Sequence, residues 1–238
     1  MSAVGNATIA WPRRGGRLAL RVDARGGRIR SLKSRRTGRE FFFQDPRPKP
    51  RGRGYAGSPV CGQDECFPTV APARGPGGRD HGVLWDHTWR LRDEGRRLVG
   101  WAHRPGGLPV DFVRVISDEG DGAIHLAYTL VNLGRRPLSF LYSAHPVLAA
   151  GPETRLELDG VRSLRVLGHN GVLRADRVQA WPEARRRDGV RVRLDREMRP
   201  ATGVAGKWFL RARDVRAARW HAGRERLCLD WDRDALPW

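Results

Sequence analysis

Residues 61–89, CGQDECFPTVAPARGPGGRDHGVLWDHTW, gather carboxylates, histidines and tryptophans in a chain otherwise rich in arginine. The end of this stretch alternates in a way that predicts a strand, because successive side chains of a strand point to opposite faces. One face of the predicted strand would carry His81, Val83, Trp85, His87 and Trp89. Two imidazoles and two indoles make a poor apolar surface, since each buried ring nitrogen needs a hydrogen-bond partner.

This predicted face has two interpretations. In the first it binds a sugar, with tryptophan packed on the C–H face of a pyranose and the histidines contacting its hydroxyls. In the second, both tryptophans belong to the core and both histidines are exposed. The strand alone does not separate them, so the rest of the chain has to be considered.

Short segments with alternating apolar and polar residues follow one another along the chain and predict strands. They are residues 17–22, 28–32, 82–93, 97–103, 110–117, 123–132, 154–160, 190–195, 207–213, 217–222 and 226–232. Turn signals such as DARGG and NLGRRP separate them, and no window predicts an amphipathic helix. Many strands without crossover helices favour an all-β, antiparallel sandwich or barrel. With no repeat or composition break, we expect one domain over residues 1–238.

The charge of the chain is strongly positive, at +19, which by itself would suggest a polyanionic partner. Only Lys33, Lys49 and Lys207 are lysines among the 45 basic residues, and the arginines are spread along the chain. Selection for phosphate contacts would use either residue, so a solvated basic surface is favoured. No aromatic and basic motif of the RNA-recognition or cold-shock type is present, so a basic nucleic-acid-binding β protein is the least favoured alternative.

The three cysteines, Cys61, Cys66 and Cys228, form no CxxC pair. We expect reduced, buried thiols and no zinc site, with a Cys61–Cys66 disulfide as the alternative. No apolar run approaches the length of a membrane span, and the N-terminus lacks the pattern of a signal peptide. These features predict a cytoplasmic protein without a membrane partner.

Several segments in order resemble the galactose mutarotase-like family, which includes aldose 1-epimerases and hexose-6-phosphate epimerases. They are GGRIRSLKSRRTGREFFFQ (26–44), GQDECFPTVAP (62–72), DHGVLWDHTWRL (80–91), LVNLGRRPLSFLYSAHPVLA (130–149) and the final LCLDWDRDALP. The likeness covers most of residues 16–237, and ECFPT, DHGxLW and AHP in this order are its specific parts. It implies a β-supersandwich with a sugar-binding cleft on one sheet.

The resemblance also implies roles for individual residues. His81 corresponds to the first active-site histidine, which helps to hold the sugar, and His145 to the second, which protonates the ring oxygen. Glu65 corresponds to a polar residue lining the same cleft, and we add Trp85 and His87 as expected substrate contacts. Without the resemblance, His145 would be interpreted as a core histidine at a strand end.

Mutarotation needs a general base for the anomeric hydroxyl and a general acid for the ring oxygen, and it needs no cofactor or metal. Histidine suits the acid because its ordinary pKa of about 6.5 lies near working pH. In the family the base is a glutamate on a segment that follows the one corresponding to LCLDWDRDALP. The sequence ends at ALPW, before that segment, so the base is not assigned; Asp230, Asp232 and Asp234 match no motif.

We therefore expect an aldose 1-epimerase-like protein that binds a monosaccharide or a sugar phosphate. The alternative is a non-catalytic carbohydrate-binding module, or an inactive fragment, of the same fold. The Gly/Pro/Arg-rich stretches 45–59 and 72–80 are too long for hairpin turns, which is typical of functional loops. For a phosphorylated sugar, Arg51, Arg53 or Arg74 in these loops could bind the phosphate bidentately.

Overall fold

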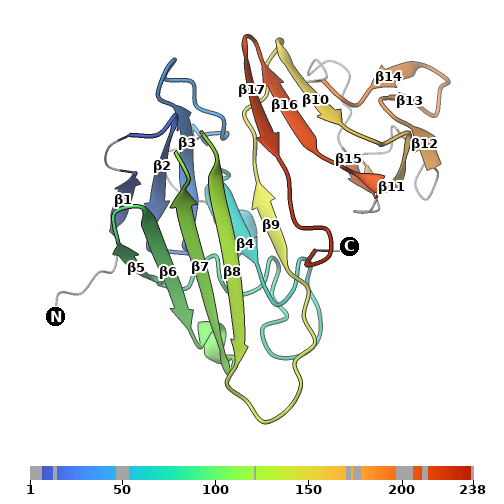
Figure 1. Cartoon of the computed structure of the whole chain (residues 1–238). Helices are drawn as coiled ribbons and strands as arrows, with labels where there is room; N and C mark the ends of the chain where they lie inside the picture. The colour runs from blue at the N-terminus through green and yellow to red at the C-terminus, as the bar shows by residue number, and fades with distance from the viewer. Residues whose placement is uncertain are drawn as a thin grey trace. The chain divides into compact units, whose positions relative to one another are not determined.

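The computed structural model describes residues 7–12, 15–46, 54–120, 122–169, 173, 178–196, 206–210 and 214–236. The chain divides into two compact units, Met1–Ala149 and Ala150–Trp238. Strands dominate both units (Figure 1), and every strand pair is antiparallel, which confirms the predicted all-β class. The single domain expected over residues 1–238 stays a prediction.

The first unit contains two sheets. The five-stranded sheet has the order β1-β2-β3-β4-β9, with β1 (Thr8–Trp11), β2 (Leu18–Asp23), β3 (Ile29–Ser34), β4 (Gln63–Cys66) and β9 (Ser143–Pro146). The four-stranded sheet is a meander of β5 (Arg90–Asp93), β6 (Arg97–His103), β7 (Val110–Asp118) and β8 (Ile124–Asn132). Two short 3₁₀ helices, η1 (Tyr55–Gly57) and η2 (Pro105–Gly107), lie in the connections.

The core of the first unit follows from the period of two in β7. Its residues alternate between buried and partly exposed, so that Val110, Phe112, Arg114 and Ile116 form one buried row. Phe112 packs with Phe67 and the Trp89 ring in one buried cluster. Arg114 is the exception in this row, a charged side chain at 1% exposure that requires a partner.

The second unit is built from shorter strands. One sheet has the order β10-β16-β17, with β10 (Thr154–Leu158), β16 (Ala218–Ala222) and β17 (Glu225–Leu229). Another has the order β12-β11-β15, with β11 (Ser163–His169), β12 (Val178–Ala180) and β15 (Gly206–Phe209), and β13 (Glu183–Arg185) pairs with β14 (Arg191–Arg193). Its buried cluster is Leu164, Val166, Leu173, Ala184, Val192 and Leu194.

The expected strand over residues 82–93 is wrong for residues 82–89, because only Arg90–Asp93 forms a strand there. His81 and Gly82 have φ values of 57° and 71°, which are incompatible with a strand. Gly82 lies so close to the backbone of Phe67 that a Cβ would meet the Phe67 carbonyl oxygen at 2.0 Å. Residues 81–88 therefore fold as turns, and the predicted shared face of imidazoles and indoles does not exist.

No helix among the described residues is long and apolar enough to cross a membrane.

Candidate functional site

Four segments of the first unit bring the candidate site together. Strands β4 and β9 pair so that Asp64 lies opposite His145, which places both side chains on one face of the sheet. Tyr55 comes from η1, and His81 from the turn after the 72–80 stretch. The structure thus joins the two histidines that the resemblance selects, although 64 positions of sequence numbering separate them.

Tyr55 contacts both histidines. Its ring stacks on the ring of His81, with centroids 3.6 Å apart and planes 11° apart. Its hydroxyl oxygen lies 3.1 Å from Nδ1 of His145. The two imidazole centroids are 5.1 Å apart, so both histidines can act on one small ligand. Sequence reasoning missed Tyr55, because it lies in the Arg-rich stretch and outside every motif.

A buried ion pair supports the Tyr55 hydroxyl. Arg28 donates two hydrogen bonds to Asp64, with Nε–Oδ1 and Nη2–Oδ2 distances of 2.6 and 3.0 Å. The Tyr55 hydroxyl donates to Oδ2 of Asp64 at 3.0 Å. Burial and the negative charge of Asp64 raise the pKa of Tyr55, so the hydroxyl stays protonated.

These contacts assign the tautomer of His145. Because the Tyr55 proton points to Asp64, the Tyr55 oxygen accepts the hydrogen bond from Nδ1–H of His145. In this tautomer the lone pair of the neutral ring lies on Nε2, so Nε2 is the nitrogen of His145 that can accept a proton.

His81 has its own carboxylate partner. Nδ1 of His81 lies 2.9 Å from Oδ1 of Asp80, and the two side chains are 19% and 43% exposed. The positive φ of His81 turns the chain so that its ring lies against Tyr55. His81 is therefore a second oriented imidazole with solvent access.

Cys66 completes this face of β4. Cys66 is fully buried. Its sulfur, one ring nitrogen of His81 and one ring nitrogen of His145 all lie within 4.8 Å of one another. Burial, followed by the charges of Asp64, Glu65 and Asp80, raises the pKa of the Cys66 thiol to about 12. The thiol is therefore protonated at neutral pH and is a poor nucleophile.

This thiol pKa predicts slow alkylation. At pH 8 about 10⁻⁴ of Cys66 would be thiolate, so iodoacetamide should label it at least about 100-fold more slowly than the exposed Cys228. Mass spectrometry of the labelled peptides at several reaction times measures both rates in one sample. Equal rates in the native protein would contradict the described environment of Cys66.

Glu65 does not lie with the histidines. It points to the opposite face of β4 and is fully buried. Arg114 donates to Glu65 at 2.7 Å, and the hydroxyls of Tyr128 and Tyr142 donate to it at 3.1 and 2.8 Å. Burial, and then the charge of Glu65, raise the pKa of both tyrosines. Glu65 thus joins the two sheets of the first unit through a buried network, whereas the resemblance implies a place in the cleft.

Trp85 supports the site and offers little surface of its own. It is 9% exposed, and its Nε1–H donates to the Gly82 carbonyl oxygen at 3.0 Å. Its ring packs edge-on against Tyr55 at 5.6 Å, and the Arg79 guanidinium lies 5.1 Å from its ring centre. Of the two interpretations of the tryptophans, the structure favours the core.

His87 is half-buried, and among the described contacts none joins it to His81 or His145. Burial lowers its pKa, with Asp86 opposing and His103 adding to the shift. Of the arginines considered for a phosphate, Arg51 and Arg53 lie outside the described residues and Arg74 is exposed. The described site therefore consists of His81, His145, Tyr55 and their carboxylate partners.

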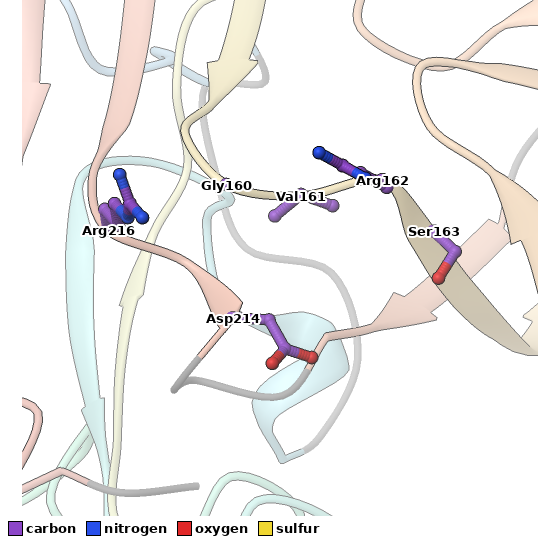
Figure 2. A pocket seen from close by; sticks show the side chains of 6 residues that line it. All are labelled: Gly160, Val161, Arg162, Ser163, Asp214 and Arg216. Carbon is purple, nitrogen blue, oxygen red and sulfur yellow. The ribbon is translucent and has the colours of Figure 1, made fainter.

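The second unit has an open pocket of about 350 Å³, lined by Gly160, Val161, Arg162, Ser163, Asp214 and Arg216. Figure 2 shows that these side chains do not converge on a common point. The lining contains no histidine and its charged side chains are exposed. It lacks the buried, oriented groups that distinguish the site around His145.

No protein-family model matches the chain, and no curated protein matches it. Solved structures that share its fold include two from Lactobacillus species. A galactose mutarotase-like protein from Lactobacillus casei is 16% identical with a TM-score of 0.63, covering 95% of this chain and 79% of its own. A galactose mutarotase related enzyme from Lactobacillus acidophilus is 14% identical with a TM-score of 0.57, covering 94% and 75%. The galactose mutarotase-like fold implied by the sequence is confirmed.

Proposed function

We propose that this protein binds a hexose or hexose phosphate against the adjacent side chains of His81 and His145 and interconverts its anomers. The observation that carries the proposal is the pair of imidazoles 5.1 Å apart, each with Nδ1 bound to an oxygen, in a galactose mutarotase-like fold. Two oriented groups that exchange protons near neutral pH are what ring opening requires. Nothing in this chemistry needs a redox group.

His145 acts as the acid. Protonated at Nε2, it donates to the ring oxygen of the sugar while the C1–O bond breaks. Its positive charge before transfer is stabilised by the Tyr55 hydroxyl and the buried Asp64, which Arg28 holds in place. After rotation about C1–C2 the same nitrogen takes the proton back as the ring closes.

The His81–Asp80 pair supplies the base. Asp80 accepts the hydrogen bond from Nδ1–H of His81, which orients the ring and leaves the opposite nitrogen to take the proton of the anomeric hydroxyl. The 19% exposure of His81 allows a sugar hydroxyl to reach it. This role goes beyond the sugar-holding role that the resemblance implies for His81.

The proposal is tested by following the optical rotation of freshly dissolved α-glucose, α-galactose and glucose 6-phosphate with and without the protein. Acceleration of at least one anomerisation is expected. If none is accelerated although a sugar binds in a calorimetric titration, the protein is a binding module of the same fold. If no sugar binds, the proposal is wrong.

Replacing Tyr55 with phenylalanine tests the hydrogen-bond chain to Asp64. The ring stack on His81 remains, but His145 loses the oxygen at its Nδ1. A hydrogen bond to a charged group contributes about 1.5–3 kcal/mol, which corresponds to about 10–100-fold in rate, so we expect kcat to fall by about that factor with a small change in KM. Anomerisation kinetics over a range of sugar concentrations measure both. A changed KM with unchanged kcat would show that Tyr55 only contacts the sugar.

A further inference from the structure

Cys66, His81 and His145 have the donor set of a metal site. Thiolate sulfur and imidazole nitrogen are the preferred ligands of Zn²⁺, and three protein ligands with an open fourth position are typical of catalytic zinc. With Zn–S and Zn–N bonds of about 2.3 and 2.0 Å, tetrahedral ligand atoms lie about 3.5 Å apart. The three donor atoms here lie within 4.8 Å of one another, so small side-chain movements would bring them to a common ion.

We propose that Cys66, His81 and His145 bind a divalent transition-metal ion, such as Zn²⁺, whose fourth position is open to solvent or ligand. The sequence alone predicts no such site, because positions 66, 81 and 145 have no recognisable metal-binding spacing. The site arises from the pairing of β4 with β9 and from the turn at His81.

The contacts around the two imidazoles suit metal binding. Ligating histidines almost always give their other ring nitrogen to a carboxylate or another oxygen, which fixes the ring and its tautomer. Asp80 does this for His81 at 2.9 Å, and the Tyr55 hydroxyl does it for His145 at 3.1 Å. The stack of Tyr55 on His81 further restricts the ring. Both imidazoles are thus oriented before a metal arrives.

The charges near the sulfur also suit a cation. The carboxylate of Asp80 lies 2.9 Å from His81, and Asp64 lies two residues before Cys66 on the same face of β4. A divalent ion is attracted by these carboxylates and stabilises the Cys66 thiolate directly. Binding releases the Cys66 proton to solvent and changes no oxidation state. The buried sulfur would then be a metal ligand rather than an inert core atom.

This inference does not rest on the proposed sugar reaction, since it concerns only the three donor atoms. If both hold, the metal occupies imidazole nitrogens that anomerisation needs, and Zn²⁺ is an inhibitor of the reaction. Metal binding is therefore measured directly, without an activity assay, so that the two proposals can fail separately.

The experiment is a titration of the full chain with Co²⁺ after treatment with a chelator. We expect one Co²⁺ per chain and a near-ultraviolet thiolate-to-cobalt charge-transfer band, displaced by Zn²⁺. Cys66→Ser should abolish the band, whereas Cys228→Ser, which removes an exposed thiol, should keep it. Circular dichroism of the variants verifies that each is folded.

A second variant changes a ligand that lies in a turn and not on the buried strand β4. His81→Asn places in the turn a residue that tolerates positive φ but is a weak zinc ligand. We expect it to weaken Co²⁺ binding more than 100-fold. This loss exceeds the roughly 10–100-fold that is typical when a residue hydrogen-bonded to a metal ligand is replaced. Asp80→Asn, which changes such a residue, should weaken binding about 10–100-fold. Absence of the band in the parent chain, or a band lost in Cys228→Ser and kept in Cys66→Ser, would overturn the inference.

Discussion

Replacing His145 with glutamine should slow anomerisation by about 10²–10⁴-fold, the contribution that a positioned acid or base typically makes. Glutamine keeps a polar side chain of similar reach on β9, so the β4–β9 pairing should persist. It cannot carry a proton to the ring oxygen, which is why the loss should fall on kcat. Optical rotation under saturating sugar measures the effect.

The control for this variant is His125→Gln. His125 is an exposed histidine on β8, in the same unit but outside the described site, and its replacement should leave the rate unchanged. If His145→Gln and His125→Gln have equal rates, His145 is not the acid. Binding of the sugar by His145→Gln, measured by calorimetry, separates loss of chemistry from loss of affinity.

The class of fold follows from local sequence, because most strands alternate with period two. Segments 97–103 and 110–117 predict β6 and β7 almost residue for residue, since their apolar residues face one core. Strands β4 and β9 were not predicted. Their sequences, QDEC and SAHP, are polar and short, and they form strands because they pair with each other.

In the candidate site, too, some residues are predicted from the sequence and others depend on contacts between distant segments. His81 and His145 were selected by resemblance, and the structure brings them together. Tyr55, Asp64 and Arg28 could not be predicted, because their roles depend on contacts between segments without any common period. Trp85 and His87 were placed on one face by a strand pattern that the positive φ at His81 and Gly82 breaks.

Replacing Glu65 with glutamine should destabilise the first unit by about 3–5 kcal/mol, the usual cost of removing one partner from a buried ion pair. Glu65 and Arg114 have side-chain exposures of 0% and 1%, so water cannot replace the lost carboxylate. Glutamine has one amide oxygen in place of the two carboxylate oxygens, so the hydroxyls of Tyr128 and Tyr142, which donate to Oε1 and Oε2, cannot both keep an acceptor. Hydrogen exchange of the β7 amides reports the stability of this unit without assuming two-state unfolding of the whole chain.

The matched comparison is Glu94→Gln, because Glu94 pairs with Arg92 at side-chain exposures of 37% and 81%. Pairs at the surface contribute about 0–1 kcal/mol, so this variant should exchange almost like the parent. The comparison also decides between two roles for Glu65. A residue that lines the cleft would change sugar affinity while exchange at β7 stays as slow as in Glu94→Gln. If Glu65 instead joins the two sheets, its replacement should speed exchange at β7 and leave sugar affinity unchanged. The reason is that its carboxylate has Arg114 and two tyrosines as partners and no exposed surface for a sugar.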